Sequence, residues 1–413
     1  MNKYTIDGFN DIHYNELKVY DFIRDTMENT MRSYGYRQVL TPSFESYDMY
    51  NIDGAFPRSK MFKLIGNDGK VLVLRPDATI PIARMAASRY RNSQEVLKFG
   101  YITNIFRDSS STTDFRKEFM QAGIEYMGNS LPDCDGEIIA LSINILKELG
   151  IKKIHIDMGN VTFLNGLFDE IQIEVIEKVK ILSYIENKNI GELKAYLDSI
   201  EVSKEISQIL CHVPMLFGKF KDTVNQAKKL CINQKMTAAL NTMEETYEII
   251  NSYGYEDYIF IDLGFTNQFN YYSGLIFKGY INGIGEAILS GGRYDTLSST
   301  FGVNRPASGF GINISLLMDT LINRSDEKDD YNILFLYDDN KRRESLNLAR
   351  KLRSQGIIVD YIHSSLEEGI KKENYKYILK CIDNSFELST KTDKQLLREE
   401  EILTKLKEAK LCI

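Results

Sequence analysis

Hydrophobic and polar positions follow a hairpin pattern between residues 95 and 128. Two apolar runs, EVLKFGYITNIFR and FRKEFMQAGIEYMG, flank the polar segment DSSSTTD at 108–114. This pattern predicts two antiparallel strands joined by a loop. Gln121 and Glu125 are an even number of residues apart, so they share one face of the second strand. Together with Glu118 they could line a small-molecule site, or they could belong to a half-solvated strand pair.

Other segments before residue 95 have equally regular patterns. Apolar residues at helical spacing predict a helix over 14–34, which Gly35 ends. The remaining expectations in this part are a strand at 37–42, a hairpin of strands 62–64 and 71–74, and a helix that starts near Asp77 and Thr79 with Pro81 in its first turn.

The pattern after residue 128 is mixed and contains a long helical insertion. We expect a helix over 135–149, a strand over 153–159, and almost continuous helix from about 160 to 253. Strands are expected at 258–263, 271–277, 286–290 and 306–314, and a helix at 315–322. Residues 1–322 therefore indicate a mixed core of strands and helices that contains a helical insertion.

The last part of the chain indicates a second, smaller domain. Residues 323–330 (NRSDEKDD) are polar and charged, as in a linker. Residues 331–413 alternate strand and helix and predict a small α/β domain with a parallel sheet, ending in a charged helix over 393–411.

Composition narrows the class of protein. The chain has 413 residues, a net charge of −7 and a pI near 5.4, and this acidic charge argues against a dedicated nucleic-acid binder. No signal core or membrane span is visible, and five scattered cysteines resemble reduced residues of a cytoplasmic protein. We expect neither a metal site nor a cofactor.

Single motifs leave the function open. The segment IGEAILSGGRYDTL lacks the spacing of a phosphate loop, and its glycines favour close strand packing. Tyr271 and Tyr272 could be the core and surface faces of one strand, or an aromatic face that holds a flat ring. The four histidines have no obvious partner for acid–base chemistry.

Seven motifs in order are more specific than any one of them. They are GFNDI, YGYRQVLTPSFE, LRPDAT, FR followed by KEFMQAGIE, NYYSGLIF, SGGRYDTL and SGFGINI. In this order the chain resembles the histidyl-tRNA synthetase core across residues 1–322. The resemblance implies a class II synthetase fold, which is an α+β core with an antiparallel sheet flanked by helices. Residues 331–413 resemble a shortened anticodon-binding domain of that family.

The cations that the resemblance implies for histidine activation are largely missing. Transfer of a carboxylate to the α-phosphate of ATP needs positive charge at phosphorus. The loop at 108–114 has no basic residue, and two synthetase arginines fall on Asn267 and Leu316. Only Arg107 remains of this set. We therefore expect no catalytic residues and no aminoacylation by this chain.

The amino-acid pocket of the family, in contrast, is largely kept. By resemblance, Asp77 and Thr79 would meet the α-amino group of histidine, beside Arg107. The other pocket residues implied are Gln121, Glu125, Tyr271 and Tyr272. A carboxylate such as Glu125 can accept an imidazole N–H.

A chain that binds histidine without activating it is similar to the regulatory subunits of ATP phosphoribosyltransferase. That resemblance implies a short catalytic subunit as partner, histidine as ligand, and a homodimer within a hetero-oligomer. It also implies a role in the first step of histidine biosynthesis and in histidine feedback. Two alternatives stay open: an active histidyl-tRNA synthetase, and a stand-alone interaction protein of synthetase ancestry.

Overall fold

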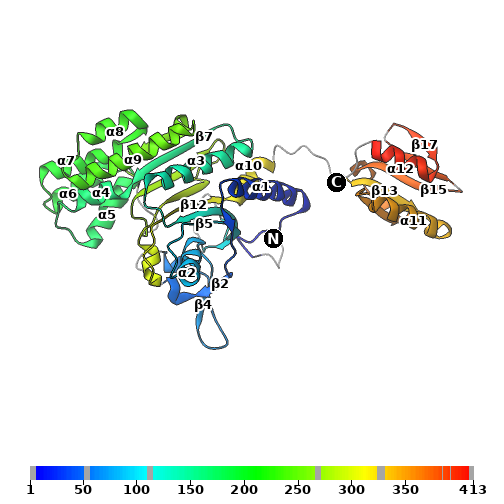
Figure 1. The fold of residues 1–413 in the computed structure, drawn as a ribbon, viewed down its shortest axis with the longest axis horizontal. Coiled ribbons are helices and arrows are strands. Elements are labelled where there is room, and N and C mark those ends of the chain that lie inside the picture. Colours follow the sequence, from blue (N-terminus) through cyan, green and yellow to red (C-terminus); the bar gives the residue numbers. More distant parts are fainter. Residues whose placement is uncertain are drawn as a thin grey trace. The chain divides into compact units, whose positions relative to one another are not determined.

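The computed structural model describes residues 6–50, 56–108, 115–265, 271–322, 331–383, 385–390 and 392–408. The chain divides into two compact units, residues 1–322 and 323–413, which are described one at a time (Figure 1). The expected linker at 323–330, position Asn267 and most of the 108–114 loop lie outside the described residues.

The first unit is built around a sheet in which nine strands are described. Their order is β1-β5-β6-β12-β11-β10-β7-β9-β8, antiparallel except for the β1–β5 and β7–β9 pairs. The strands are β1 Arg37–Gln38, β5 Leu97–Phe106, β6 Glu118–Met127, β7 Ile154–Asn160, β8 Phe217–Lys219, β9 Ile259–Asp262, β10 Leu275–Ile281, β11 Leu289–Arg293 and β12 Ala307–Asn313. The α+β class with a largely antiparallel sheet is confirmed.

The hairpin predicted from the alternating pattern forms the centre of one half of this sheet. Strands β5 and β6 pair without interruption from Leu97 opposite Met127 to Phe106 opposite Glu118. Because the side chains alternate, Phe119, Gln121 and Glu125 project from the same face of β6.

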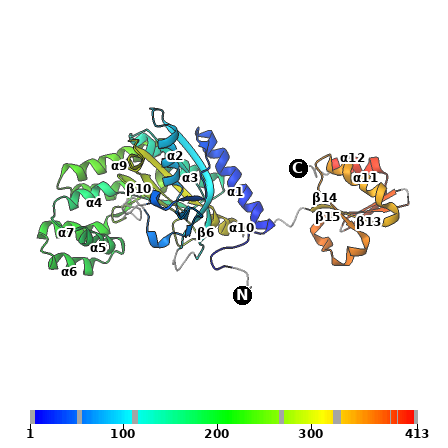
Figure 2. The ribbon, with the colours of Figure 1, turned by 90° about the horizontal axis from the view of Figure 1, so that it is seen from below.

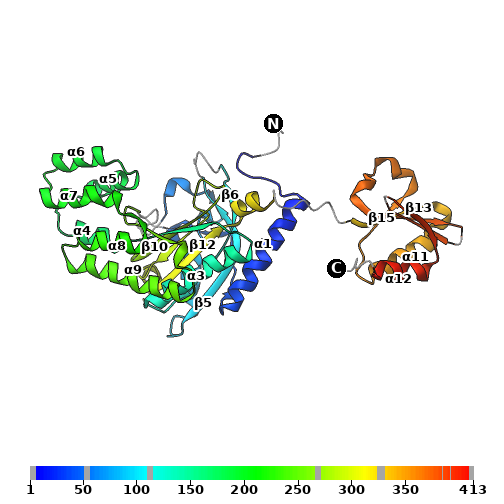
Figure 3. The same cartoon turned by 90° about the horizontal axis from the view of Figure 1, so that it is seen from above.

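Helices bury the opposite face of the sheet. Helices α1 (Tyr14–Ser33), α3 (Pro132–Glu148) and α9 (Gln234–Ser252) lie along this face (Figure 3). Their apolar residues and those of the strands form one large core. Helix α10 (Ile314–Ile322) follows β12 and contacts α1 and β6. Gly35, with φ +84°, ends the first helical segment as its position predicted.

A second, smaller group of elements packs against β5. It contains the three-stranded sheet β2-β4-β3 and helix α2 (Thr79–Arg89), which share a second apolar core with β5. Its remaining elements are β2 Phe44–Ser46, β3 Lys63–Ile65, β4 Val71–Leu74, η1 Tyr47–Tyr50 and η2 Arg58–Lys60. The gap between this layer and the central strands is where the site described below lies.

The expected insertion is mostly helical, and its helices α4 to α7 gather at the end of the first unit away from α1 (Figure 2). One short strand, β8, was not predicted. The elements are α4 Val161–Phe168, α5 Val175–Glu186, α6 Ile190–Ser199, α7 Lys204–His212, η3 Val213–Met215, α8 Phe220–Lys228 and η4 Glu256–Tyr258.

The second unit has a sheet in the order β14-β13-β15-β16-β17 and its own apolar cores. Only β14, β13 and β15 are parallel, so the prediction of a parallel sheet was incomplete. The elements are β13 Tyr331–Tyr337, η6 Asp339–Lys341, α11 Arg342–Arg353, β14 Val359–His363, η7 Ser364–Gly369, η8 Lys372–Asn374, β15 Tyr375–Ile382, β16 Ser385–Ser389, β17 Lys394–Leu397 and α12 Glu399–Glu408.

Three further boundaries differ from the predictions. The strand expected at 37–42 is only Arg37–Gln38, with Pro42 beyond it. The charged terminal helix begins at Glu399, because residues 394–397 pair with β16 as strand β17. Tyr271 and Tyr272 precede β10, so they are not opposite faces of one strand. Among the described residues, none of the helices combines the length and apolar character that a membrane crossing requires.

The short helix η5 (Leu297–Phe301) packs against α2 and begins shortly after Tyr294 in the sequence. The turn ends at Gly302, whose φ is +79°. This contact connects the end of β11 to the smaller layer, and it helps to fix one wall of the site.

Candidate functional site

Six of the seven sequence-predicted residues line one small cavity between α2 and the central strands. They are Asp77, Thr79, Arg107, Gln121, Tyr271 and Tyr272. The seventh, Glu125, lies directly under the cavity and is 1% exposed. The cavity volume is about 40 Å³. Segments separated by up to two hundred residues therefore bring their polar side chains to one place.

Glycines leave the face of the sheet open beneath these side chains. Glu125 is opposite Gly309, and Gly123 is opposite Gly311. A Cβ built on Gly309 would lie 2.2 Å from Glu125 Oε2, and one on Gly311 would lie 2.7 Å from the Gln121 amide. The glycines of the SGFGINI motif thus make room for the polar groups and for a ligand above them.

Asp77 sits where the chain enters α2. Its Oδ1 accepts a hydrogen bond from the Ile80 N–H at 2.8 Å, which satisfies a free N–H group of the first helical turn. Burial raises the pKa of the Asp77 carboxyl, while this hydrogen bond and the Arg107 guanidinium oppose the shift. A buried carboxylate near a cation can bind an ammonium group by charge-assisted hydrogen bonds.

Arg107 is held between two aromatic rings. Its guanidinium carbon lies 5.4 Å from the centre of the Phe56 ring and 5.3 Å from that of Phe119, and Nε donates to Pro76 O at 2.7 Å. Burial lowers the pKa of Arg107, and Asp77 opposes this. A planar, fixed guanidinium of this kind suits a carboxylate or phosphate group.

Glu125 is a buried acid whose pKa is strongly shifted by its surroundings. Burial raises its pKa to about 8, and the Asp77 charge adds to this. Hydrogen bonds from Tyr294 and Thr79 act in the opposite direction. Near neutral pH the empty site therefore holds a protonated carboxyl group that can give its proton to a basic ligand.

Tyrosines form the walls around Glu125. The rings of Tyr271 and Tyr272 are 4.9 Å apart, and those of Tyr271 and Tyr294 are 5.8 Å apart at an edge-to-face angle of 79°. Tyr101 donates from its hydroxyl group to Gln121 Oε1 at 3.1 Å. Burial raises the pKa of these phenols, so they remain neutral donors.

Sequence reasoning missed Tyr101 and Tyr294. A signal for Tyr294 was present, because it belongs to the SGGRYDTL motif. Tyr101 lies opposite Gly123, and this register is known only from the structure. The adjacent Arg293 forms a buried ion pair with Asp135, Nη2 to Oδ2 at 2.8 Å, and this pair anchors the end of β11 to α3. It thereby fixes the backbone that carries Tyr294.

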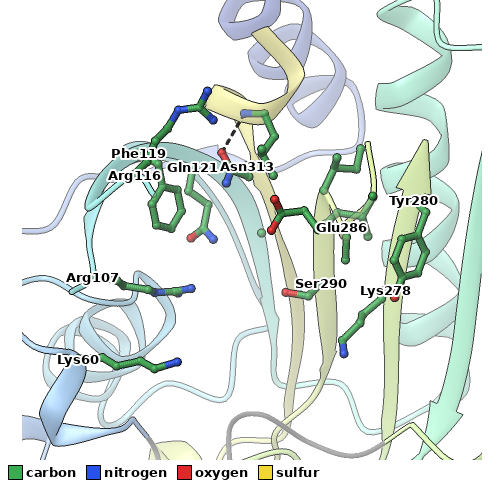
Figure 4. Close-up of a pocket in the computed structure, with 16 residues that line it drawn as sticks. Lys60, Arg107, Arg116, Phe119, Gln121, Lys278, Tyr280, Glu286, Ser290 and Asn313 are labelled. Atoms are coloured by element: carbon green, nitrogen blue, oxygen red, sulfur yellow. Dashed lines mark hydrogen bonds between the residues drawn. The ribbon is translucent and has the colours of Figure 1, made fainter. Parts of the chain in front are cut away.

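A larger cleft of about 470 Å³ continues from the small cavity (Figure 4). The two share Arg107, Gln121, Ser290 and Gly311. Leu316, at the position of a missing synthetase arginine, also lines the cleft. The small cavity alone is below the roughly 300–1,000 Å³ typical of ligand pockets, so a small-molecule ligand would also occupy part of this cleft.

In the described part of the chain, no group of three His, Cys, Asp or Glu side chains is arranged to hold a metal ion. The site is therefore described by its carboxyl groups, its one fixed guanidinium and its tyrosines. Such a set can bind a zwitterion that carries a basic ring.

Comparison with known proteins gives one consistent family. The family model described as histidyl-tRNA synthetase matches residues 8–317. The ATP phosphoribosyltransferase regulatory subunit of Ruminiclostridium cellulolyticum is 36% identical over 360 residues, 86% of each chain. That of Clostridium acetobutylicum is 34% identical over 390 residues, 93% of this chain and 94% of the relative. The chain belongs to the family of ATP phosphoribosyltransferase regulatory subunits.

Solved structures agree with this assignment. A structure described as an ATP phosphoribosyltransferase regulatory subunit/histidyl-tRNA synthetase from Bacillus halodurans has 30% identity and a TM-score of 0.82 and covers 93% of this chain. Histidyl-tRNA synthetase from Nostoc has 19% identity and a TM-score of 0.79, which shows the shared fold. The family recognised from the ordered motifs is confirmed.

Proposed function

We propose that this chain is a cytoplasmic, non-catalytic regulatory subunit of ATP phosphoribosyltransferase that binds histidine in the small cavity. It would act with a short catalytic subunit in the first step of histidine biosynthesis. The observation that carries the proposal is the match to regulatory subunits over nearly the full length of both chains. The relatives' names support the choice of partner, and the charged groups of the cavity support the choice of histidine as ligand.

The charges of the cavity support histidine as the ligand. Asp77 is placed for the α-ammonium group, Arg107 for the α-carboxylate, and Glu125 for the imidazole ring. Asp77 and Glu125 are buried and Arg107 is half-buried, and the charges of Asp77 and Arg107 each oppose the effect of burial on the other's pKa. Charge-assisted hydrogen bonds of this kind contribute about 1.5–3 kcal/mol each.

Regulation rather than histidine activation fits the residues around the cavity. The activation step would need cations at the α-phosphate of ATP, and one expected arginine position is Leu316, an apolar residue of α10. The other, Asn267, lies outside the described residues. Of the cations expected from the family motifs, only Arg107 lies at the small cavity.

A second copy of the chain is the proposed partner within the hetero-oligomer. Ile65 and Val71 lie opposite each other on one face of the three-stranded sheet and are 78% and 41% exposed. Exposed apolar side chains of this size are typical of interfaces, and a two-fold axis is the commonest symmetry of homodimers.

The proposal is tested by measuring phosphoribosyl-ATP formation by a short catalytic subunit from the same organism, with and without this chain. We expect the rate to rise when the chain is added. An unchanged rate, with both proteins folded, would overturn the proposal. Histidine-dependent ATP–pyrophosphate exchange by this chain alone would instead favour an active synthetase.

Binding to the pocket can be examined independently by calorimetry with histidine. Tyr271→Ala should weaken binding by about tenfold or more, because the ring forms one wall of the cavity. The matched control is Tyr255→Ala, which changes a half-buried tyrosine just before η4 that does not line the cavity. Equal loss in both variants would mean that the assigned pocket is wrong.

A further inference from the structure

Arg75 is the largest fully buried side chain in the described part of the chain, at 1% exposure. It lies between β4 and α2, two residues before Asp77. Its guanidinium group donates to carbonyl and hydroxyl oxygens and, among the described residues, to no carboxylate. Burying a charge without an opposite charge is costly, so a position that keeps one needs a physical reason.

The guanidinium group joins two segments that lie on either side of it. On one side Nη1 donates to Thr41 O at 2.7 Å and to Pro42 O at 2.9 Å, in the connection between β1 and β2. On the other side Nη2 donates to Asn104 O at 2.9 Å and to the Thr103 hydroxyl group, both on β5. A planar guanidinium presents donors in both directions, whereas the single ammonium group of a lysine cannot reach both segments.

The backbone around Arg75 extends this connection to the charged groups of the cavity. Arg75 O accepts a hydrogen bond from the Phe106 N–H at 3.0 Å. Pro76 O accepts one from Arg107 Nε at 2.7 Å. The next residue along the chain is Asp77. Residues 75–77 therefore hold the end of β5, the Arg107 side chain and the Asp77 carboxyl group in one arrangement.

Asp77 and Arg107 carry the opposite charges that we assign to the two ends of the amino-acid head group. An ammonium and a carboxylate group on the same carbon atom must meet these charges at a fixed separation. A site gains affinity when its groups are held at the required separation before the ligand arrives. Arg75 holds both segments on which this separation depends.

We propose that Arg75 is a positioning residue for amino-acid recognition, which holds Asp77 and Arg107 at the separation that a ligand with both an ammonium and a carboxylate group requires. The inference rests on the proposed histidine site. Arg75 does not line the cavity, so it acts through these two residues. Its replacement should change which ligand is preferred as well as how tightly histidine is bound.

The test compares histidine with histamine, which has the same ring and ammonium group but lacks the carboxylate. Calorimetry with the full wild-type chain should show that histidine binds about tenfold or more tightly than histamine. In Arg75→Lys, which keeps the charge, this ratio should fall below about threefold, because Arg107 is no longer held in place beside Asp77. A purely structural defect would weaken both ligands by the same factor and leave the ratio unchanged.

Arg305 provides a matched control, because it is a buried arginine outside the cavity that also donates to backbone carbonyl groups. It is 6% exposed and donates to Glu95 O at 3.0 Å and to Tyr90 O at 3.2 Å. Arg305→Lys removes the same fork of donors from a different part of the first unit. It should leave the ratio of the two affinities unchanged.

Thr103→Val is a second variant for the case in which Arg75→Lys does not fold. It keeps the guanidinium group and removes one of its acceptors on β5, so the ratio should fall by about twofold or more. Measured wild-type binding of histidine with an unchanged ratio in the folded variants would overturn this inference alone, as would an equal fall in Arg305→Lys. Absence of histidine binding by the wild type would overturn the proposed ligand and this inference with it.

Discussion

At the scale of single residues, Glu125 determines how the site responds to pH. Its pKa of about 8 lies above that of a free imidazole, which is about 6.5. Between these values the empty site holds one proton and free histidine holds none on its ring. A complex in which the carboxyl and the ring share one proton then forms without proton uptake or release.

This arrangement predicts a plateau in histidine affinity. Below pH of about 6.5 the ring must lose a proton to bind, and above about 8 the complex must take one up, so affinity falls on both sides. Calorimetry across pH 5.5–9.5 measures the profile. In Glu125→Gln the fall in histidine affinity above a pH of about 8 should disappear. In Glu118→Gln, a change at the outer end of β6, it should remain.

The same group makes the empty protein less stable as pH rises. The pKa of Glu125 in the folded protein is about 8, above the usual 4.5. Its contribution to the free energy of unfolding is therefore fully present below pH 4.5 and is lost as the pH rises to about 8. Each unit of pKa shift corresponds to about 1.4 kcal/mol. Urea unfolding of Glu125→Gln should therefore show a higher free energy of unfolding at pH 8 than the wild type, with little difference at pH 4.5.

An equal or lower stability of Glu125→Gln at pH 8 would contradict a protonated, desolvated Glu125. The amide keeps the size of the side chain and can still accept a hydrogen bond from Tyr294. Loss of packing is therefore not expected to mask the effect.

The sequence predicted these residues unevenly, for physical reasons. Gln121 and Glu125 could be placed on one face because strand period alone fixes this. Tyr101 could not be assigned, since its role depends on the register with β6 and on the bare Gly123 opposite it. Lys60 and Lys278 reach one cleft from distant segments, and no local pattern encodes such a meeting.

At the scale of elements, the long periodic segments were the predictable ones. The β5–β6 hairpin and the helices at 14–33 and 132–148 each have many apolar positions that report the same period. Tyr271 and Tyr272 were misplaced because the run from 271 to 277 reads as one apolar strand. Strand pairing starts only at Leu275, opposite Asn160.

Strand β17 was missed for a related reason. The segment 393–411 is rich in charged residues at helical spacing, and its first part forms a strand only because β16 offers a partner. Pairing at the edge of a sheet thus overrode local propensity.

The close packing of β12 on β6 makes a prediction at this scale. Gly309→Ala would place a Cβ 2.4 Å from Ile124 O, a backbone atom that cannot move alone, and 2.2 Å from Glu125 Oε2. We expect a loss of about 1–3 kcal/mol in the free energy of unfolding and the loss of histidine binding. Chemical denaturation and calorimetry measure the two effects.

The control for this change is Gly191→Ala in α6, where an added Cβ meets nothing within 4 Å. It should leave binding unchanged and stabilise the chain by up to about 1 kcal/mol, because alanine favours helix. A harmless Gly309→Ala would mean that the two strands do not approach as closely as described.

At the scale of the whole molecule, the two units have separate cores. Every cavity residue named here belongs to residues 1–322. The second unit buries its own apolar residues, among them Phe335 and Leu379.

A chain that ends at residue 322 should therefore still bind histidine. We expect its dissociation constant to stay within about twofold of the full-length value, because local sites depend mainly on the unit that contains them. Circular dichroism would show whether the shortened chain is folded, and calorimetry would give the affinity. If the shortened chain is folded but does not bind histidine, residues 323–413 are needed for binding, which would contradict this prediction.

We propose that the synthetase-like pocket of this chain senses histidine rather than activating it. The most direct measurement is a histidine titration of phosphoribosyl-ATP formation by the complex, with the wild-type chain and with Glu125→Gln. The account predicts inhibition of the wild-type complex and a shift of the inhibition curve by about tenfold or more in the variant, as expected for loss of a charge-assisted contact. Identical curves for the two complexes would contradict it.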